Sequence, residues 1–229
     1  MDEKEAIHSL NIIKKVLEKH KIIFWLDYGT LLGAYRDKKL IKWDSDIDLA
    51  TWITNKNSVE KTFKELSNDF DIFQNKYMIG FRRKNIMISL DFYDKKGNMA
   101  VRKSRFSNNF IDKIVSYLIW INSAWDCKIE NTQVSRITKF ACEITIKLKK
   151  DRKKVIIKIL KKIHVFFSNG FIIGVPIDYF YNLKQIRFYK MDFNVPVNTD
   201  EYLMYRYGCN WKTPKKDYVY YIEDGAIQN

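Results

Sequence analysis

The sequence is poor in the residues that interrupt or crosslink a chain: its 229 residues include only 8 Gly, 3 Pro and 3 Cys. With 46% hydrophobic residues, this composition excludes a disordered chain and indicates a folded domain with a core. The cysteines are odd in number and form no CxxC pair, which argues against a disulfide framework or a structural zinc site. They fit a reducing compartment.

The chain also has no recognisable signal peptide and no long apolar run. Its first ten residues, MDEKEAIHSL, lack the basic and apolar segments of a secretory signal. The longest apolar stretch, residues 114–125, is interrupted by Ser116, Asn122 and Ser123 and is too short to cross a bilayer. We therefore expect a cytoplasmic protein, with attachment to the inner face of the membrane left open.

Acidic residues are outnumbered, 27 against 41 Lys and Arg, which gives a net charge of +14. A basic excess indicates an anionic partner: nucleic acid, a phosphorylated small molecule or an anionic membrane surface. The basic residues are densest over 147–162, and residues 152–167 alternate an apolar stripe with lysines at helical spacing. This helix either packs on the core or lies in the interface of an anionic membrane.

A glycine turn followed by an acidic pair carries the strongest chemical signal. The β-rich residues 22–28 end at Gly29, and Thr30 can cap a short helix whose free N–H groups bind anions. In a strand over 46–52, Asp46 and Asp48 project from one face. Two carboxylates so close are costly without a cation, and Mg²⁺ or Mn²⁺ prefers oxygen ligands. The alternative is a solvated surface pair.

The remaining pattern predicts helices and strands around this stretch. We expect helices over 3–20, 58–68 and 108–150, and a short helix that starts at Asn198 or Thr199 and stops at Gly208. A hairpin is expected from strands 70–74 and 77–82, followed by a strand over 86–93 and a turn over 94–97. In that last strand Asp91 is the single acid on the polar face.

Three blocks of this sequence resemble the LicD family, which includes bacterial phosphocholine transferases and the relatives of fukutin and the fukutin-related protein. The first block is FWLDYGTLLGAYR at 24–36 with IKWDSDID at 41–48. The second is LDFY at 90–93, and the third runs from Val195-Pro196 through Tyr207-Gly208 to Pro214. The blocks occur in the family's order and frame nearly the whole chain.

The resemblance implies an α+β, nucleotidyltransferase-like fold: a mixed β-sheet flanked by helices, in a single domain over residues 1–229. Residues 1–100 would form the catalytic core, 101–185 a basic helical insertion, and 186–229 a C-terminal segment that completes the site. It also implies a reaction: transfer of phosphocholine, phosphoethanolamine, phosphoglycerol or phosphoribitol from a CDP-linked donor, with release of CMP. The acceptor would be a sugar hydroxyl of a free or lipid-linked cell-surface glycan, as in lipopolysaccharide, capsule or teichoic acid.

Each candidate site residue has a proposed task under this reading. Asp46, Asp48 and Asp91 would hold one or two Mg²⁺ or Mn²⁺ ions, with Asp91 bridging metals or acting as general base. A second group would contact the donor phosphates or shape that part of the site: Gly29, Thr30, Arg36, Lys42, Asp44, Arg206 and Tyr207. Asp44 is expected to fix the loop, and Arg206 and Tyr207 either reach the site or pack locally.

Two other functions remain open. A nucleotidyltransferase that moves NMP from an NTP to a small molecule, protein or RNA would use the same acids. A non-catalytic basic module that binds nucleic acid would not need Asp46 or Asp48, and no recognisable motif supports it. The sequence predicts no oligomeric state.

Overall fold

The computed structural model describes residues 1–106, 114–115, 118–119, 150–167 and 169–228. The chain divides into two compact units, and each is described by itself. The first combines Met1–Ser104 with Ile172–Asn229, and the second is Arg105–Phe171. The expected helix over 108–150 falls almost entirely outside the described residues. The division into segments 1–100, 101–185 and 186–229 stays a prediction.

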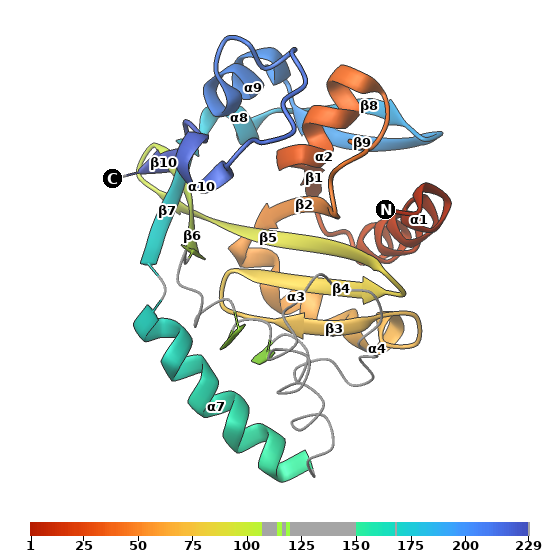
Figure 1. Cartoon of the computed structure of the whole chain (residues 1–229). Helices are drawn as coiled ribbons and strands as arrows, with labels where there is room; N and C mark the ends of the chain where they lie inside the picture. Colours follow the sequence, from red (N-terminus) through yellow and green to blue (C-terminus); the bar gives the residue numbers. More distant parts are fainter. Residues whose placement is uncertain (107–113, 116–117, 120–149, 168, 229) are drawn as a thin grey trace. The chain divides into compact units, whose positions relative to one another are not determined.

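A mixed β-sheet forms the centre of the first unit (Figure 1). Its strands follow the order β1-β2-β5-β6-β7-β10, and β4 pairs with both β5 and β3. The pair β2–β5 is parallel, whereas β1–β2, β3–β4, β4–β5, β5–β6 and β7–β10 are antiparallel. The bounds are β1 Phe24–Leu26, β2 Asp46–Trp52, β3 Asp71–Gln74, β4 Met78–Arg83, β5 Ile86–Lys96, β6 Met99–Phe106, β7 Asn169–Pro176 and β10 Ile227–Gln228. The α+β class with a mixed sheet is confirmed.

Short helices and one further hairpin complete the described elements. A π-helical turn, η1 (Gly33–Asp37), continues α2, and a 3-10 turn, η2 (Ile53–Asn55), precedes α3. The hairpin consists of β8 (Leu183–Phe188) and β9 (Met191–Pro196). The helices are α1 Glu3–Lys19, α2 Tyr28–Leu32, α3 Lys56–Lys61, α4 Phe63–Leu66, α7 Lys150–Phe167, α8 Asp178–Tyr181, α9 Thr199–Tyr207 and α10 Tyr220–Glu223. None of the described helices is both long and apolar enough to span a bilayer.

Most local predictions are confirmed and three are wrong. The structure has α1, β2, the β3–β4 hairpin, β5, α7 and α9 within a few residues of their expected positions. The helix over 58–68 is instead broken at Thr62, whose hydroxyl bonds to the Val59 carbonyl. Strand β5 runs on to Lys96, so the turn consists of Gly97 and Asn98 only. Helix α2 starts at Tyr28 and is capped by Asp27, not by Thr30.

A buried polar network around Asp27 joins elements that are far apart in the sequence. The fully buried Asp27 carboxylate accepts hydrogen bonds from the Tyr28 N–H at 2.9 Å and the Tyr93 hydroxyl at 2.9 Å. It also accepts from the Tyr202 hydroxyl at 2.5 Å and from Arg206 Nη1 at 3.2 Å. One carboxylate therefore fixes the start of α2 to β5 and to α9.

Arg206 supplies the positive charge of this network. Its side chain is fully buried, and its Nε donates to both carboxylate oxygens of Asp224 at 3.0 Å. The guanidinium carbon lies 3.9 Å from the centre of the Tyr28 ring, a cation–π contact in a desolvated place. Two buried carboxylates share this one arginine, so its loss would leave both without an ion-pair partner among the described residues.

We expect Arg206→Met to destabilise the fold strongly, because it leaves Asp27 and Asp224 buried and unpaired. Breaking a buried ion pair in this way costs about 3–5 kcal/mol. The matched control is Arg187→Met, which removes an arginine that is 65% exposed and paired with Asp192; such a surface pair is worth about 0–1 kcal/mol. Urea unfolding followed by circular dichroism checks the difference, and equal midpoints for the two variants would contradict it.

Candidate active site

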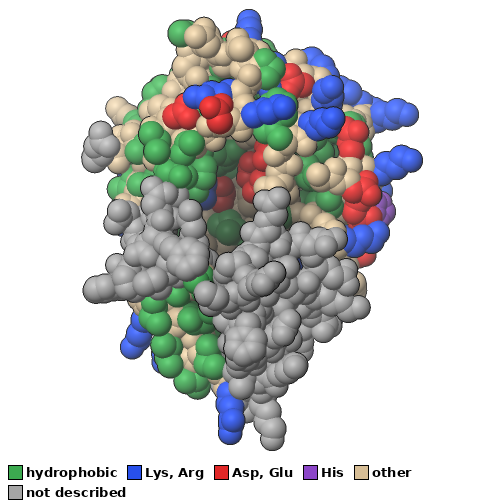
Figure 2. Space-filling view, in the orientation of Figure 1, with side chains coloured by type: hydrophobic (Ala, Val, Ile, Leu, Met, Phe, Trp, Pro, Cys, Tyr) green, Lys and Arg blue, Asp and Glu red, His purple; other side chains and the backbone are tan. Residues whose placement is uncertain are grey.

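A cavity of about 900 Å³ lies in the first unit. Its wall comes from α2 and η1, the loop before β2, the polar face of β2, β4 and β5, Arg102 on β6, and the segment 207–223. Figure 2 shows a hollow in this face of the molecule, with acidic side chains in its wall. The N-terminal motif and the C-terminal segment thus meet around one space.

Three carboxylates cluster on one side of this cavity. Asp44, Asp46 and Asp48 each offer an oxygen, and these oxygens all lie within 4.8 Å of one another. Asp46 and Asp48 lie on one face of β2, and Asp44 is contributed by the loop just before the strand. The predicted pair is therefore brought together, but its third member is Asp44, which the sequence analysis assigned to the loop. The Asp-x-Asp-x-Asp alternation over 44–48 is the signal that pointed to it.

Gly29 lets Asp44 approach. A Cβ atom at position 29 would lie 2.2 Å from Asp44 Oδ2, so the Asp44 carboxylate would have to move away. The Asp44 side chain is also held by the Ser45 N–H, which donates to Oδ1 at 3.0 Å, and the Asp44 N–H donates to the Ile41 carbonyl. The glycine of the motif thus makes room for a carboxylate of the cluster.

The charges of the cluster are poorly compensated. Burial, and then the charge of Asp46, raises the pKa of Asp44 to about 7 and the pKa of Asp48 well above its ordinary range. The one neutral donor on Asp48 is the Ser89 hydroxyl at 3.0 Å, and no Lys or Arg of the described residues forms an ion pair with any of the three acids. An all-oxygen donor set with this charge fits a hard divalent cation.

Asp91 lies outside the cluster and has its own partner. It is 2% exposed, and its Oδ2 forms an ion pair with Arg102 Nη1 at 2.5 Å. Burial raises the pKa of Asp91 to about 6, and the charge of Arg102 opposes that rise. The sequence analysis missed Arg102, since the pattern predicted no strand after Gly97 that would place it opposite β5.

The other predicted residues divide into those that line the cavity and those that do not. Gly29, Arg36 and Tyr207 line it, although Arg36 already donates to Asp37 through Nε and Nη2. Thr30 is buried, and its hydroxyl accepts from the Asp48 N–H at 2.8 Å, so it positions β2. Lys42 is exposed and is not a lining residue, and neither is the buried Arg206.

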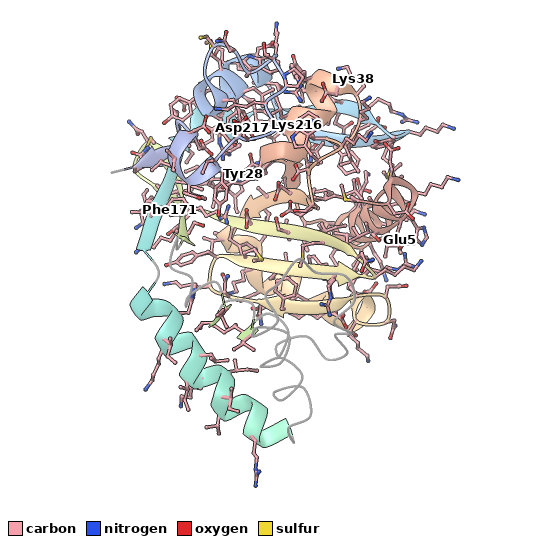
Figure 3. The ribbon with its side chains drawn as sticks, viewed as in Figure 1. Glu5, Tyr28, Lys38, Phe171, Lys216 and Asp217 are labelled. Atoms are coloured by element: carbon pink, nitrogen blue, oxygen red, sulfur yellow. The ribbon has the colours of Figure 1, made fainter. Side chains whose placement is uncertain are left out.

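The sequence analysis also missed most of the C-terminal wall. Tyr28 and Lys216 both line the cavity, and Figure 3 labels them together with Asp217. The Lys216 ammonium lies 5.6 Å from the centre of the Trp43 ring. The wall thus offers aromatic faces and cations. Trp, Tyr and Lys are frequent over residues 207–221, but their spacing does not indicate which side chains face the cavity. Its other members are Asn210, Trp211, Thr213, Pro214, Lys215, Tyr218, Tyr220 and Glu223.

A family model described as "LicD/FKTN/FKRP, nucleotidyltransferase domain" matches residues 21–143. The chain belongs to this family. The match contains the three clustered acids, Asp91 and Arg102. The resemblance drawn from the sequence blocks is confirmed, and with it the nucleotidyltransferase-like class of the fold.

Curated relatives cover part of the chain. A stretch of 104 residues is 30% identical to "Ribitol-5-phosphate transferase FKTN" from Homo sapiens and, equally, to the protein of that name from Macaca fascicularis. The match covers 42% of this chain and 22% of the relatives' length. The matched stretch thus spans about a fifth of the length of these proteins.

Two solved structures of the antibiotic-resistance factor ANT(2'')-Ia show a distant likeness. The solution structure gives a TM-score of 0.35 at 10% identity, over 72% of this chain and 95% of that one. The crystal structure with adenylyl-2''-tobramycin gives 0.32 at 12% identity, over 68% and 98%. Scores this low support no argument about this chain.

We expect Asp46→Asn to abolish Mn²⁺ binding, because it removes one of three clustered carboxylates. Even outer partners of a metal site are worth about 10- to 100-fold in affinity, so a ligand should cost more than about 100-fold. Electron paramagnetic resonance of free Mn²⁺ measures the binding, and Asp192→Asn, at an exposed ion pair, is the control. Gly29→Ala, which pushes Asp44 away, should weaken binding about 10- to 100-fold. Wild-type affinity in Asp46→Asn would disprove the site.

Proposed function

We propose that this protein is a metal-dependent transferase that moves a phospho-alcohol unit from a CDP-linked donor to a sugar hydroxyl of a glycan, with release of CMP. The observation that carries the proposal is the Asp44–Asp46–Asp48 cluster inside a large cavity of a LicD-family member. Among the candidate alcohols, ribitol ranks first because the curated relatives are named ribitol-5-phosphate transferases. Choline, ethanolamine and glycerol are the others.

On the donor side, the three carboxylates would hold Mg²⁺ or Mn²⁺, one ion or two. When bound, the metal neutralises phosphate charge and its build-up in the transition state. The chain itself offers Arg36 and Lys216 on the cavity wall as phosphate contacts. The bare backbone of Gly29 lets a phosphate come close to α2. The aromatic residues of segment 207–221 offer faces for the cytosine ring.

On the acceptor side, Asp91 would act as the general base. The acceptor hydroxyl gives its proton to the Asp91 carboxylate while its oxygen forms a bond to the donor's alcohol-bearing phosphorus. The bond from that phosphorus to the bridging oxygen breaks, and CMP leaves with the electron pair. Asp91 lines the cavity and is separate from the metal-binding cluster, which leaves its carboxylate available for proton transfer.

The test is to incubate the protein with CDP-ribitol, CDP-choline, CDP-ethanolamine or CDP-glycerol, Mg²⁺ and candidate glycans, and to measure CMP. We expect CMP from one of these donors.

Asp91→Asn should lower kcat about 10²- to 10⁴-fold, the usual contribution of a general base, with little change in donor KM. The control is Asp71→Asn, at an ion pair with Arg82 on the β3–β4 hairpin. No CMP from any donor, together with NMP transfer from an NTP, would favour the nucleotidyltransferase alternative instead.

Helix α7 suggests where the enzyme works. Its 18 residues, KDRKKVIIKILKKIHVFF, carry seven Lys and Arg against one Asp. Val155 and Ile159 are 60% and 52% exposed, beside the exposed Arg152, Lys158 and Lys162. Apolar side chains flanked by lysines suit the boundary of an anionic bilayer. We propose that α7 attaches the protein to such a surface, where a lipid-linked acceptor would be found.

We expect the protein to float with phosphatidylglycerol-containing vesicles at low salt and not with phosphatidylcholine vesicles. Lys158→Glu/Lys162→Glu should weaken this binding at least about tenfold, since each basic residue is worth about 1 kcal/mol near an anionic surface. The control with the same net charge is Lys64→Glu/Lys190→Glu, at exposed positions of the first unit. Equal losses in both double variants would mean that α7 has no special part in binding.

A further inference from the structure

Two buried polar atoms at the cavity have no hydrogen-bond partner. Among the described residues, the buried unpartnered side-chain atoms are Asp91 Oδ1, Arg102 Nε and Trp25 Nε1. Trp25 belongs to the aromatic core and does not line the cavity, whereas Asp91 and Arg102 both do. Buried polar groups are normally bonded, and each exception costs about 1–3 kcal/mol, so such a pair at a site calls for an explanation.

The two side chains are held together. Arg102 Nη1 forms an ion pair with Asp91 Oδ2 at 2.5 Å and donates a hydrogen bond to the Tyr28 hydroxyl oxygen, also at 2.5 Å. The guanidinium carbon lies 5.3 Å from the centre of the Tyr28 ring. Tyr28 is itself fixed at the start of α2, where it has a positive φ of 45° and lies against Arg206. Tyr28 therefore orients Arg102, and Arg102 orients Asp91.

The two atoms without a hydrogen-bond partner favour one class of ligand. Asp91 Oδ1 accepts a hydrogen bond and Arg102 Nε donates one, so a single group that both donates and accepts can satisfy them. The negative charge of Asp91 would repel a phosphate, and the positive charge of Arg102 would repel an ammonium. A neutral hydroxyl is repelled by neither charge.

The position of Asp91 relative to the acidic cluster also suits the binding of an acceptor. Ser89, which bonds to Asp48, lies two residues before Asp91 on β5, and at about 3.3 Å per residue the two positions are about 6.6 Å apart on one face. A phosphorus atom held at the cluster and a hydroxyl held at Asp91 can therefore be neighbours without competing for the same ligands.

We propose that Asp91 and Arg102 form the binding site for the acceptor hydroxyl, which donates to Asp91 Oδ1 and accepts from Arg102 Nε. Arg102 is then an acceptor-binding residue that also positions the base. This inference rests on the proposed function for its biological meaning, but it predicts binding of a neutral sugar whether or not CDP-linked donors are used.

The experiment measures sugar binding and turnover separately. Saturation-transfer difference NMR with methyl α-galactopyranoside and methyl α-glucopyranoside, in the presence of CDP and Mg²⁺, reports the hydroxyl site. Titration calorimetry of CDP reports the donor site. In Arg102→Gln we expect methyl glycoside affinity to fall at least about tenfold, as for loss of a hydrogen bond to a charged group, with CDP affinity unchanged. Where a donor turns over, acceptor KM should rise and donor KM should stay.

Two further variants and one control guard against misfolding. Arg102→Lys keeps the charge next to Asp91 but loses the planar fork, so it should fold, bind CDP and still bind the glycosides weakly. Tyr28→Phe removes the oxygen that orients Arg102 and should give a smaller loss. Arg187→Gln, at an exposed arginine, should change nothing.

Each remaining outcome either overturns or supports the proposed hydroxyl site. Loss of CDP affinity in Arg102→Lys, with glycoside binding retained, would overturn the proposal in favour of a donor phosphate site. No glycoside signal with the wild-type protein would overturn it too. Glycoside binding that depends on Arg102, without CMP release from any donor, would support the hydroxyl site and count against the proposed function alone.

Discussion

The buried carboxylate of Asp27 is the interaction on which the cavity depends. The carboxylate caps α2, and the backbone N–H of Asp27 donates to the Asp48 carbonyl at 3.1 Å. The start of the helix and the acidic strand are therefore joined at one residue. Through Tyr93 and Tyr202 it also fixes β5 and α9. Because α2 is held in this way, Gly29 lies against Asp44 and Tyr28 against Arg102. The two ends of the chain build one site because one buried charge network joins them.

Local pattern predicted the strands that carry the acids, and non-local contacts decided the rest. The alternation of Asp46 and Asp48 is a property of a strand and could be predicted directly. The alternation continues to Asp44, but whether Asp44 joins them depends on how the loop lies against Gly29, fifteen positions earlier, which alternation alone does not determine. Thr30 looked like a cap because its residue type suits one, but Asp27 occupies that place, and the threonine hydroxyl instead binds the backbone of β2.

The cavity separates two kinds of chemistry. At the cluster, three acids lie together without a cationic side chain of the described residues in an ion pair, and this end of the cavity suits a metal and the phosphates it carries. At β5 and β6, an acid and an arginine neutralise each other and leave one acceptor and one donor free. The acids of the first end lie within the residues that match the family model. The second rests on Arg102, whose strand the sequence pattern did not reveal.

Strand β5 changes partner along its length, so a turn far from the cavity affects where one residue of the site lies. Its first part pairs with β2 and β4, and its last three residues pair with β6 through the turn Gly97-Asn98. Successive residues of a strand face opposite sides, so a one-residue shift of β6 at that turn would carry Arg102 to the other face of the sheet. Asp91 would then be buried without its ion-pair partner. The length of a two-residue turn, outside the cavity wall, thus sets the charge balance at the proposed base.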